Sequence, residues 1–268
     1  MTTWQSADLA ASWKAGAEAR EAAMAAATDT LFSLARIRPG LRVLECGCGS
    51  GEMAFKLADA VAPGGHVVAV DGSPEMIGVA RQSAEGRTDV EFEVADLQQL
   101  GKDGSGFEAA VARNVVMLIE DEVAALRAIR AALASGARFA CSVWTEAGNP
   151  RFVIPLEVLG EMGVDVPAGS PLLMVRRLGS EDRLAGALSA AGFTDIRCLR
   201  VTADRKFEAF ERLLADEARG PVATQLRRTL GEEATGRVLT AIGERLQQFR
   251  RGTGAVLPGR QLVAVGTA

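Results

Sequence analysis

Three glycines at alternating positions form the clearest candidate ligand-binding loop in the sequence. Gly47, Gly49 and Gly51 follow a short apolar run and stand directly before a helix-like segment that starts near Glu52. Glycine permits the positive φ angles of a tight strand-to-helix turn and removes the Cβ atoms that would keep a ligand from the backbone. The helix that follows would direct free N–H groups toward the same place. The pattern therefore predicts a small-molecule binding site at this turn.

The spacing of the loop separates several classes of nucleotide site. A dinucleotide site uses Gly-x-Gly-x-x-Gly, but Glu52 stands where its third glycine would fall, and a carboxylate there would face a pyrophosphate. The Lys and Ser/Thr of a phosphate-binding loop are also missing after Gly51. We therefore expect a ligand without phosphates, and a nicotinamide-dependent dehydrogenase is disfavoured.

Polar residues also end the apolar runs that follow the loop. Asp71 ends the second run, Asp96 follows the third, and Arg113 and Asn114 end the fourth. In open α/β sheets ligands bind at the carboxyl ends of the strands, where a carboxylate can accept from ribose hydroxyls and a guanidinium can hold a carboxylate. Each residue also has a structural alternative, because Asp favours helix N-caps and Arg can form a surface salt bridge.

The segments that position these residues alternate between strand and helix patterns. Such alternation is typical of a doubly wound α/β fold. The predicted helices cover residues 4–35, 52–61, 74–84, 121–134, 181–191 and, as amphipathic charge-rich helix, 207–250. The first predicted strand begins at Leu41. The other predicted strands cover residues 66–71, 90–94, 107–112, 138–143, 196–202 and 261–265.

The stretch Glu45-x-Gly47-x-Gly49-x-Gly51 resembles the first motif of the class I S-adenosylmethionine-dependent methyltransferases. Residues 107–114 and 133–144 resemble the fourth strand and the strand after it. The resemblance runs through nearly the whole chain, and the late helices look like the small-molecule branch related to ubiquinone and menaquinone biosynthesis methyltransferases. It implies a Rossmann-like, doubly wound seven-stranded sheet, mostly parallel with an antiparallel last strand, plus a helical cap.

The resemblance also implies a cofactor, S-adenosylmethionine, with S-adenosylhomocysteine as product. In that family the loop packs along the methionine and ribose of the cofactor, the acid after the second strand binds the ribose, and the third-strand acid meets the adenine amino group. The expected cofactor-binding residues are Glu45, Gly47, Cys48, Gly49, Gly51, Asp71, Gly72, Ser73, Met76, Ala95, Asp96, Leu97, Arg113 and Asn114.

The expected reaction is transfer of a methyl group to a carbon, nitrogen or oxygen of a small molecule by in-line displacement. Such a step depends mainly on positioning in a dry pocket, which supplies about 7 to 11 kcal/mol in well-oriented cases. No catalytic residue is assigned. Relatives often carry histidines after the fourth strand, but residues 115–118 contain none, and His66 is expected at the opposite edge of the sheet. The absence of such a histidine favours an activated carbon, an amine or an already acidic hydroxyl as the acceptor, or a carboxylate base such as Glu120 or Asp121. The alternative is a cofactor-binding scaffold or a non-methylating, pericyclic-type catalyst on the same fold.

The chain is interpreted as a single domain over residues 1–268. Within it we expect an N-terminal helical cap at 1–38, a cofactor-binding core at 39–148, and cap insertions at 149–178 and 204–254 over the substrate pocket. Trp13 and Trp144 are candidate walls of that pocket, although ordinary core packing is the alternative for both.

Composition limits the partners. The net charge is −4 and the pI near 5.3, which gives no basic footprint for nucleic acid or an anionic membrane. No apolar run is long enough for membrane insertion, and the first thirty residues hold no apolar block of signal-peptide type, so a cytoplasmic location is expected. The four cysteines, of which Cys46 and Cys48 flank the glycines, form no metal-binding pattern and are expected to be reduced. We predict no metal site, and the sequence does not determine the oligomeric state.

Overall fold

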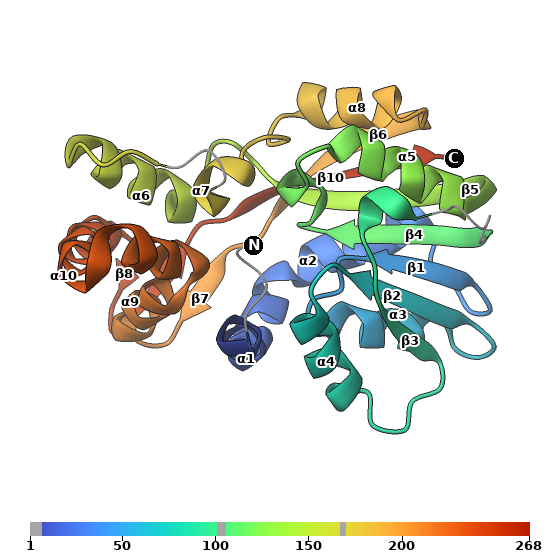
Figure 1. The fold of residues 1–268 in the computed structure, drawn as a ribbon, viewed down its shortest axis with the longest axis horizontal. Helices are drawn as coiled ribbons and strands as arrows, with labels where there is room; N and C mark the ends of the chain where they lie inside the picture. The colour runs from blue at the N-terminus through green and yellow to red at the C-terminus, as the bar shows by residue number, and fades with distance from the viewer. Residues whose placement is uncertain (1–6, 101–105, 167–169) are drawn as a thin grey trace.

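A seven-stranded sheet forms the core of the molecule in the computed structural model, which describes residues 7–100, 106–166 and 170–268. The strand order is β3-β2-β1-β4-β5-β10-β6 (Figure 1). Strand β10 is antiparallel to both of its neighbours, and the first five strands are parallel, which confirms the predicted sheet. The strands are β1 (Arg42–Cys46), β2 (His66–Asp71), β3 (Val90–Val94), β4 (Phe107–Arg113), β5 (Leu133–Trp144), β6 (Thr194–Thr202) and β10 (Arg260–Thr267).

Helices cover both faces of this sheet, as its apolar strands require. Strands β1 and β4 are buried on both sides, which fits their nearly continuous apolar sequences. One face packs against α2 (Ala17–Ala35), α3 (Glu52–Val61) and α4 (Pro74–Ser83). The other packs against α5 (Glu122–Ala132) and α8 (Glu181–Ala190). Figure 1 shows these two layers on opposite sides of the sheet.

The cap is a second lobe beside the carboxyl edge of the sheet (Figure 1). It has its own apolar cluster, which includes Leu159, Phe210, Leu213 and Ile242. The lobe consists of α6 (Pro150–Glu161), α7 (Pro171–Met174), α9 (Phe210–Arg219), α10 (Pro221–Leu246) and a three-stranded sheet of β7 (Arg205–Phe207), β9 (Gly254–Leu257) and β8 (Arg250–Arg251).

The prediction of helix over residues 207–250 is confirmed over most of its length, but Phe207 belongs to β7 and Arg250 to β8, and the helical segment is divided. Gly220 and Pro221 separate α9 from α10, and Gly231 kinks α10 with φ 80°. The small sheet was missed because its strands are short and β8 carries two arginines, so no apolar alternation marks it.

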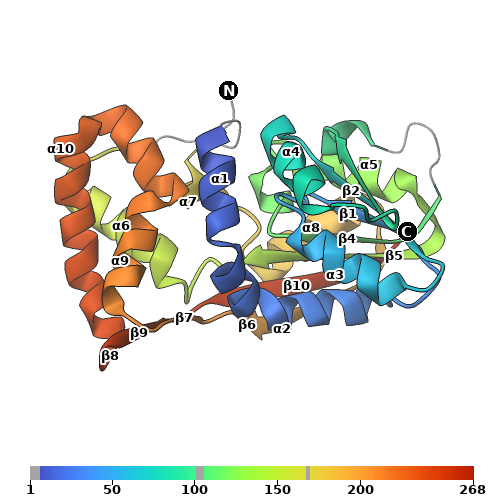
Figure 2. The same cartoon turned by 90° about the horizontal axis from the view of Figure 1, so that it is seen from below.

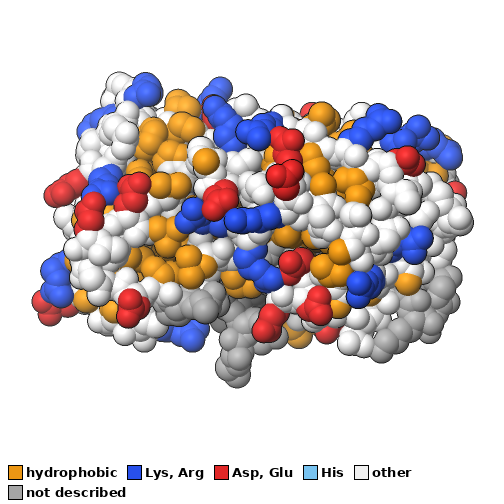
Figure 3. Space-filling view, turned by 90° about the horizontal axis from the view of Figure 1, so that it is seen from above, with side chains coloured by type: hydrophobic (Ala, Val, Ile, Leu, Met, Phe, Trp, Pro, Cys, Tyr) orange, Lys and Arg blue, Asp and Glu red, His pale blue; other side chains and the backbone are white. Residues whose placement is uncertain are grey.

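The N-terminal segment, predicted as one helix over 4–35, is two helices in the part that the structure describes, and residues 4–6 lie outside that part. Helix α1 (Ala7–Ala15) ends at the break around Gly16, where α2 begins. Figure 2 shows α1 between the cap helices and α4, with α2 running beneath the sheet. Of the helices in the described ranges, none combines the length and the apolar character needed to cross a membrane. On the face in Figure 3, basic and acidic side chains interleave rather than form one basic field.

Candidate functional site

The glycine loop joins β1 to α3 in a backbone conformation that side chains would strain. Gly47, Gly49 and Gly51 have φ angles of 72°, 54° and 90°. A Cβ at Gly47 would overlap the side chain of Val115, and one at Gly51 would lie 3.0 Å from the Phe92 ring. The three glycines are therefore required by the turn itself, whatever it binds.

Asp71 ties this loop to the neighbouring strand end. Its Oδ2 accepts a hydrogen bond from the Gly49 N–H at 2.9 Å, and its Oδ1 accepts from the Ser73 N–H at 2.9 Å. Burial raises the pKa of this carboxyl above its usual value, against the lowering effect of the backbone N–H donors. Ser73 in turn caps α4 by accepting from the Met76 N–H. The carboxylate thus fixes the loops after β1 and β2 relative to each other.

The end of β3 lies beside Asp71. The Ala95 N–H donates to the Asp71 carbonyl at 3.0 Å, which places Asp96 next in line at the sheet edge. Asp96 is exposed and caps a short 3-10 helix, η1 (Leu97–Gln99), by accepting from the Gln98 N–H. The N-cap alternative therefore holds for Asp96. Met76 is buried at the start of α4.

Two buried acceptor oxygens without partners lie at the ends of adjacent strands β1 and β4. They are Glu45 Oε2 and Asn114 Oδ1, among the residues that the structure describes. Glu45 is 1% exposed, and burial raises its pKa to about 8, so it is largely protonated at neutral pH. Asn114 has a left-handed backbone, with φ 59°, and its amide nitrogen lies 3.5 Å from the Met24 sulfur. An unpartnered buried acceptor is costly, so both oxygens mark a place for a ligand donor.

Arg113 does not extend a free guanidinium into the site. It donates to both carboxylate oxygens of Glu21 and, at 2.8 Å, to Thr28 Oγ1, both from α2. Burial would raise the pKa of Glu21, but the Arg113 and Lys56 hydrogen bonds outweigh it and lower that pKa. The expectation that Arg113 clamps a ligand carboxylate is therefore not supported, because its bidentate partner is already a residue of this chain.

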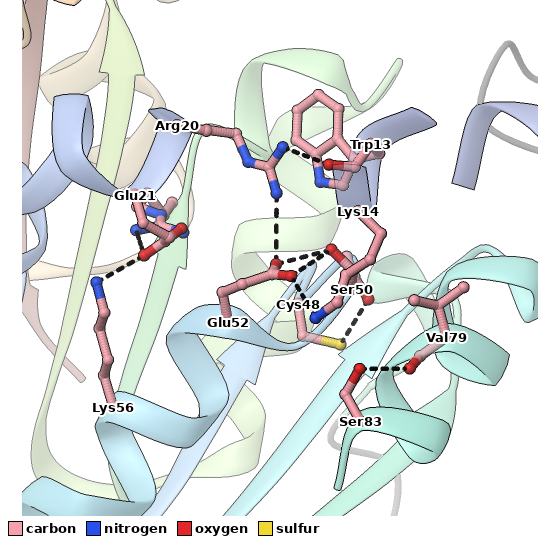
Figure 4. A network of polar contacts seen from close by, with 12 residues as sticks. Trp13, Lys14, Arg20, Glu21, Cys48, Ser50, Glu52, Lys56, Val79 and Ser83 are labelled. Atoms are coloured by element: carbon pink, nitrogen blue, oxygen red, sulfur yellow. Dashed lines mark hydrogen bonds and ion pairs between the residues drawn. The ribbon is translucent and has the colours of Figure 1, made fainter. Parts of the chain in front are cut away.

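Glu52 belongs to a charge network that holds the N-terminal helices over the loop (Figure 4). Its carboxylate lies 3.0 Å from Lys14 Nζ and 3.4 Å from an Arg20 nitrogen, and it accepts from Ser50 Oγ. The Arg20 guanidinium stacks 4.0 Å from the centre of the Trp13 ring, whose indole nitrogen lies over Gly49. Glu52 thus points toward α1 and α2, so the argument that it faces a ligand pyrophosphate is wrong.

Other candidates lie away from the glycine loop or in structural roles. His66 begins β2, at the far end of that strand from Asp71. Asp121 caps α5 and Glu120 is exposed, so the structure gives no support for either residue as a general base. Trp144 packs edge-on against Phe152, with ring centres 5.5 Å apart, where the sheet meets the cap.

The buried thiols of Cys46 and Cys48 in the loop are protonated and therefore poor nucleophiles. Burial raises the pKa of Cys46 and of Cys48 well above the usual thiol value, so neither is a thiolate at neutral pH. This supports their interpretation as small residues that flank the glycines.

Five residues that contact or extend the site were missed by the sequence reasoning. Lys14, Arg20 and Glu21 stand out as charges in an alanine-rich segment, and Ser142 and Gln261 stand out as uncharged polar residues beside apolar runs. Those signals are visible in the sequence, but their partners depend on how α2 crosses the sheet.

Comparison with known proteins agrees with this geometry. Residues 37–155 match the family model described as "Methyltransferase domain". Nocamycin O-methyltransferase of Saccharothrix syringae is 27% identical over 242 residues, which cover 79% of this chain and 85% of that protein. Ubiquinone biosynthesis O-methyltransferase of Xanthomonas campestris is 33% identical over 100 residues, 37% of this chain and 41% of that protein. The crystal structure of the [4+2]-cyclase SpnF shares the fold, with a TM-score of 0.56 and 19% identity over 90% of this chain and 80% of that one.

The chain spans 30% or less of the length of three further curated relatives that it matches. Similarity to these relatives therefore does not assign their activities to this chain. The matched segment contains the glycine loop, Asp71, Asp96 and Asn114. The strand order and the loop geometry agree with this match, and over residues 37–155 the chain is similar to the class I S-adenosylmethionine-dependent methyltransferases that its sequence resembles.

Proposed function

We propose that the protein is an S-adenosylmethionine-dependent methyltransferase that acts on a small-molecule acceptor. The observation that carries the proposal is the pair of unpartnered buried oxygens of Glu45 and Asn114 beside a loop of three left-handed glycines. The amino-acid part of this cofactor has an ammonium group with N–H donors, which two such acceptors would satisfy.

The residues that would hold the cofactor come from four neighbouring strand ends. The glycine loop offers close backbone approach, and Asp71 has lone pairs left for ribose hydroxyls after its two backbone hydrogen bonds. The exposed carboxylate of Asp96 suits the adenine amino group. The proposed set is Glu45, Gly47, Cys48, Gly49, Gly51, Asp71, Gly72, Ser73, Met76, Ala95, Asp96, Leu97 and Asn114. Arg113 is not in the set, because its guanidinium donates to Glu21 of α2.

When bound, the cofactor supplies an electrophilic methyl group on a sulfonium. The contribution of this chain is to orient the acceptor and to keep water out. Helix α1 and the start of α2, with the Trp13 ring over Gly49, cover the loop, and the Lys14 and Arg20 ion pairs hold them there. Oriented contact of this kind supplies much of the rate enhancement without a dedicated base.

The surrounding lobes fit the same proposal. We interpret residues 1–38 as a cover, 39–148 as the cofactor-binding core, and 149–178 with 204–254 as a cap over the acceptor pocket, all within one domain. Four free cysteines favour a reducing compartment, the cytoplasm. We propose no nucleic-acid partner, because the charge balance is acidic.

The test is turnover of a methyl-labelled donor. The purified protein is incubated with S-adenosylmethionine and a panel of phenols, amines, enols, lactams and carboxamides, and S-adenosylhomocysteine and labelled product are measured by mass spectrometry. The proposal predicts equal amounts of both with at least one acceptor. Binding of the donor without S-adenosylhomocysteine formation from any acceptor would favour the alternative, a scaffold or a non-methylating catalyst.

A further inference from the structure

Most of the unpartnered buried side-chain atoms in the described ranges gather at one edge of the sheet. Five belong to four strand ends, and the other two, Arg176 Nε and Glu217 Oε1, lie elsewhere. The five are Glu45 Oε2 on β1, Asn114 Oδ1 after β4, Ser142 Oγ on β5, and Oε1 and Nε2 of Gln261 on β10. Strands β1, β4, β5 and β10 are consecutive neighbours in the sheet, so these atoms line its carboxyl edge.

Ser142 and Gln261 lie close together on the same face. Ser142 pairs in register with Arg113 of β4 on one side and with Val263 of β10 on the other. Gln261 is two residues from Val263, which makes it the diagonal neighbour of Ser142 on that face. Val263 packs in the same apolar cluster as Ala27 and Leu31 of α2, so both polar side chains point toward α2.

Folding alone gives no reason for these two residues. Both are 0% exposed, and none of the three polar atoms has a partner. The residues after Gln261 are Leu-Val-Ala-Val, and an apolar side chain in its place would avoid burying a whole carboxamide unsatisfied. Costly local choices of this kind are typical of binding sites.

The charged residue in register with Ser142 is already paired within the chain. The Arg113 guanidinium next to Ser142 is paired with Glu21. Burial raises the pKa of Glu45 to about 8, so that carboxyl is mostly uncharged at neutral pH. Ser142 and Gln261 carry no charge themselves, so a charged group buried against this pair would have no counter-charge in it, whereas a neutral polar group needs none.

We propose that Ser142 and Gln261 bind the methyl acceptor through a neutral group that carries a hydrogen-bond donor and an acceptor side by side, such as a carboxamide, a lactam or a hydroxy-ketone. A carboxamide side chain presents the complementary pair, an N–H donor and a carbonyl oxygen. Asn114 lies between this subsite and the glycine loop, so a group held here is next to the cofactor. The inference rests on the proposed function, because it names the substrate class of that site.

Entry to the subsite depends on α2. Both side chains are fully buried beneath this helix, which crosses β4, β5 and β10. The proposal therefore requires the first turns of α2 to move away from the sheet before an acceptor can reach these side chains.

The experiment uses the full chain labelled with ¹⁵N and titrated with three probes of one shape: benzamide, benzoate and acetophenone. The side-chain amide signal of Gln261 is assigned by its loss in Gln261→Met, and Gln248→Met, at an exposed glutamine, is the control. We expect benzamide to shift the Gln261 amide saturably, at least tenfold weaker binding of benzamide to Gln261→Met, and unchanged binding to Gln248→Met. Benzoate and acetophenone, which lack the donor, should bind at least tenfold more weakly than benzamide.

Two results would overturn the subsite. One is a Gln261 amide that benzamide does not shift, and the other is equal benzamide affinity in Gln261→Met, as expected if the polar atoms only hold internal water. A parallel titration with S-adenosylhomocysteine follows the backbone amides of residues 47–51. If benzamide shifts the Gln261 amide signal but S-adenosylhomocysteine does not shift the amide signals of residues 47–51, the proposed function is contradicted and binding at Ser142 and Gln261 is still supported. The two failures are therefore distinguishable.

Discussion

Burial and local partners together decide the protonation of the carboxylic acids in this site more than residue type does. Glu45, Asp71 and Glu52 are all carboxylic acids near one loop, yet burial raises the pKa of the first two, whereas for Glu52 hydrogen bonds and ion pairs from Ser50, Lys14 and Arg20 outweigh burial and lower it. The sequence could predict the positions of Glu45 and Asp71 from the motif. It could not predict the partners of Arg113, because they come from a helix far away in the sequence.

Glu45 gives a prediction about stability and pH. The folded protein keeps a proton on this carboxyl up to about pH 8, whereas the unfolded chain releases it near the usual value of 4.5. The contribution of Glu45 to the free energy of unfolding is therefore fully present below about pH 4.5, falls as the pH rises toward about 8, and is constant above it. Replacement by Gln, which resembles the protonated acid, should flatten this fall.

The measurement is urea unfolding of wild type and Glu45→Gln at a series of pH values from 4.5 to 9. The difference between the two stability curves isolates Glu45 from other titrating carboxyls, such as Asp71. A constant difference across that range would show that Glu45 is ionised in the folded protein and would contradict the account.

At the scale of helices and strands, the sequence predicted the main sheet well and the connections poorly. Buried parallel strands carry apolar runs that end at polar residues, so β1, β2 and β4 are evident, and the edge strand β3 is evident from its alternation of apolar and acidic residues. The small sheet of the cap and the break at Gly16 depend on tertiary contacts that leave no periodic pattern. The same holds for the closure of α1 over the loop, which needs ion pairs between residues nearly forty positions apart.

The closure itself is testable through Glu52→Gln. This change removes the charge that holds Lys14 and Arg20, whose pairs with Glu52 are partly buried, and should destabilise the N-terminal helices by about 1 to 3 kcal/mol. Hydrogen exchange of amides in residues 13–21 should accelerate by roughly 5- to 150-fold, since about 1.4 kcal/mol corresponds to a factor of ten.

The matched control is Glu233→Gln, which removes an exposed ion pair with Arg237 on α10. That pair should contribute less than about 0.5 kcal/mol, and exchange in residues 13–21 should not change. Equal exchange in Glu52→Gln and wild type would mean that apolar packing alone closes the N-terminal helices.

At the scale of the whole molecule, two lobes meet at the carboxyl edge of the sheet, and helix α1 lies between them (Figure 2). The core lobe carries the motifs by which the sequence resembles the methyltransferases. The cap lobe carries none, which is why its sheet and the Ser142–Gln261 pair near its junction could not be assigned from sequence. Cofactor binding is thus the part of the function that the sequence predicts, and acceptor binding is the part that required the fold.

The most direct test of the central claim is calorimetric titration with S-adenosylhomocysteine and with NADH. The proteins are wild type, Asp71→Asn, and Asp89→Asn as a control at a surface ion pair with Arg87. We predict that S-adenosylhomocysteine binds wild type and the control equally, that Asp71→Asn loses about 1 to 3 kcal/mol of binding free energy, and that NADH gives no binding heat. Binding of NADH in place of S-adenosylhomocysteine, or unchanged affinity in Asp71→Asn, would contradict the account.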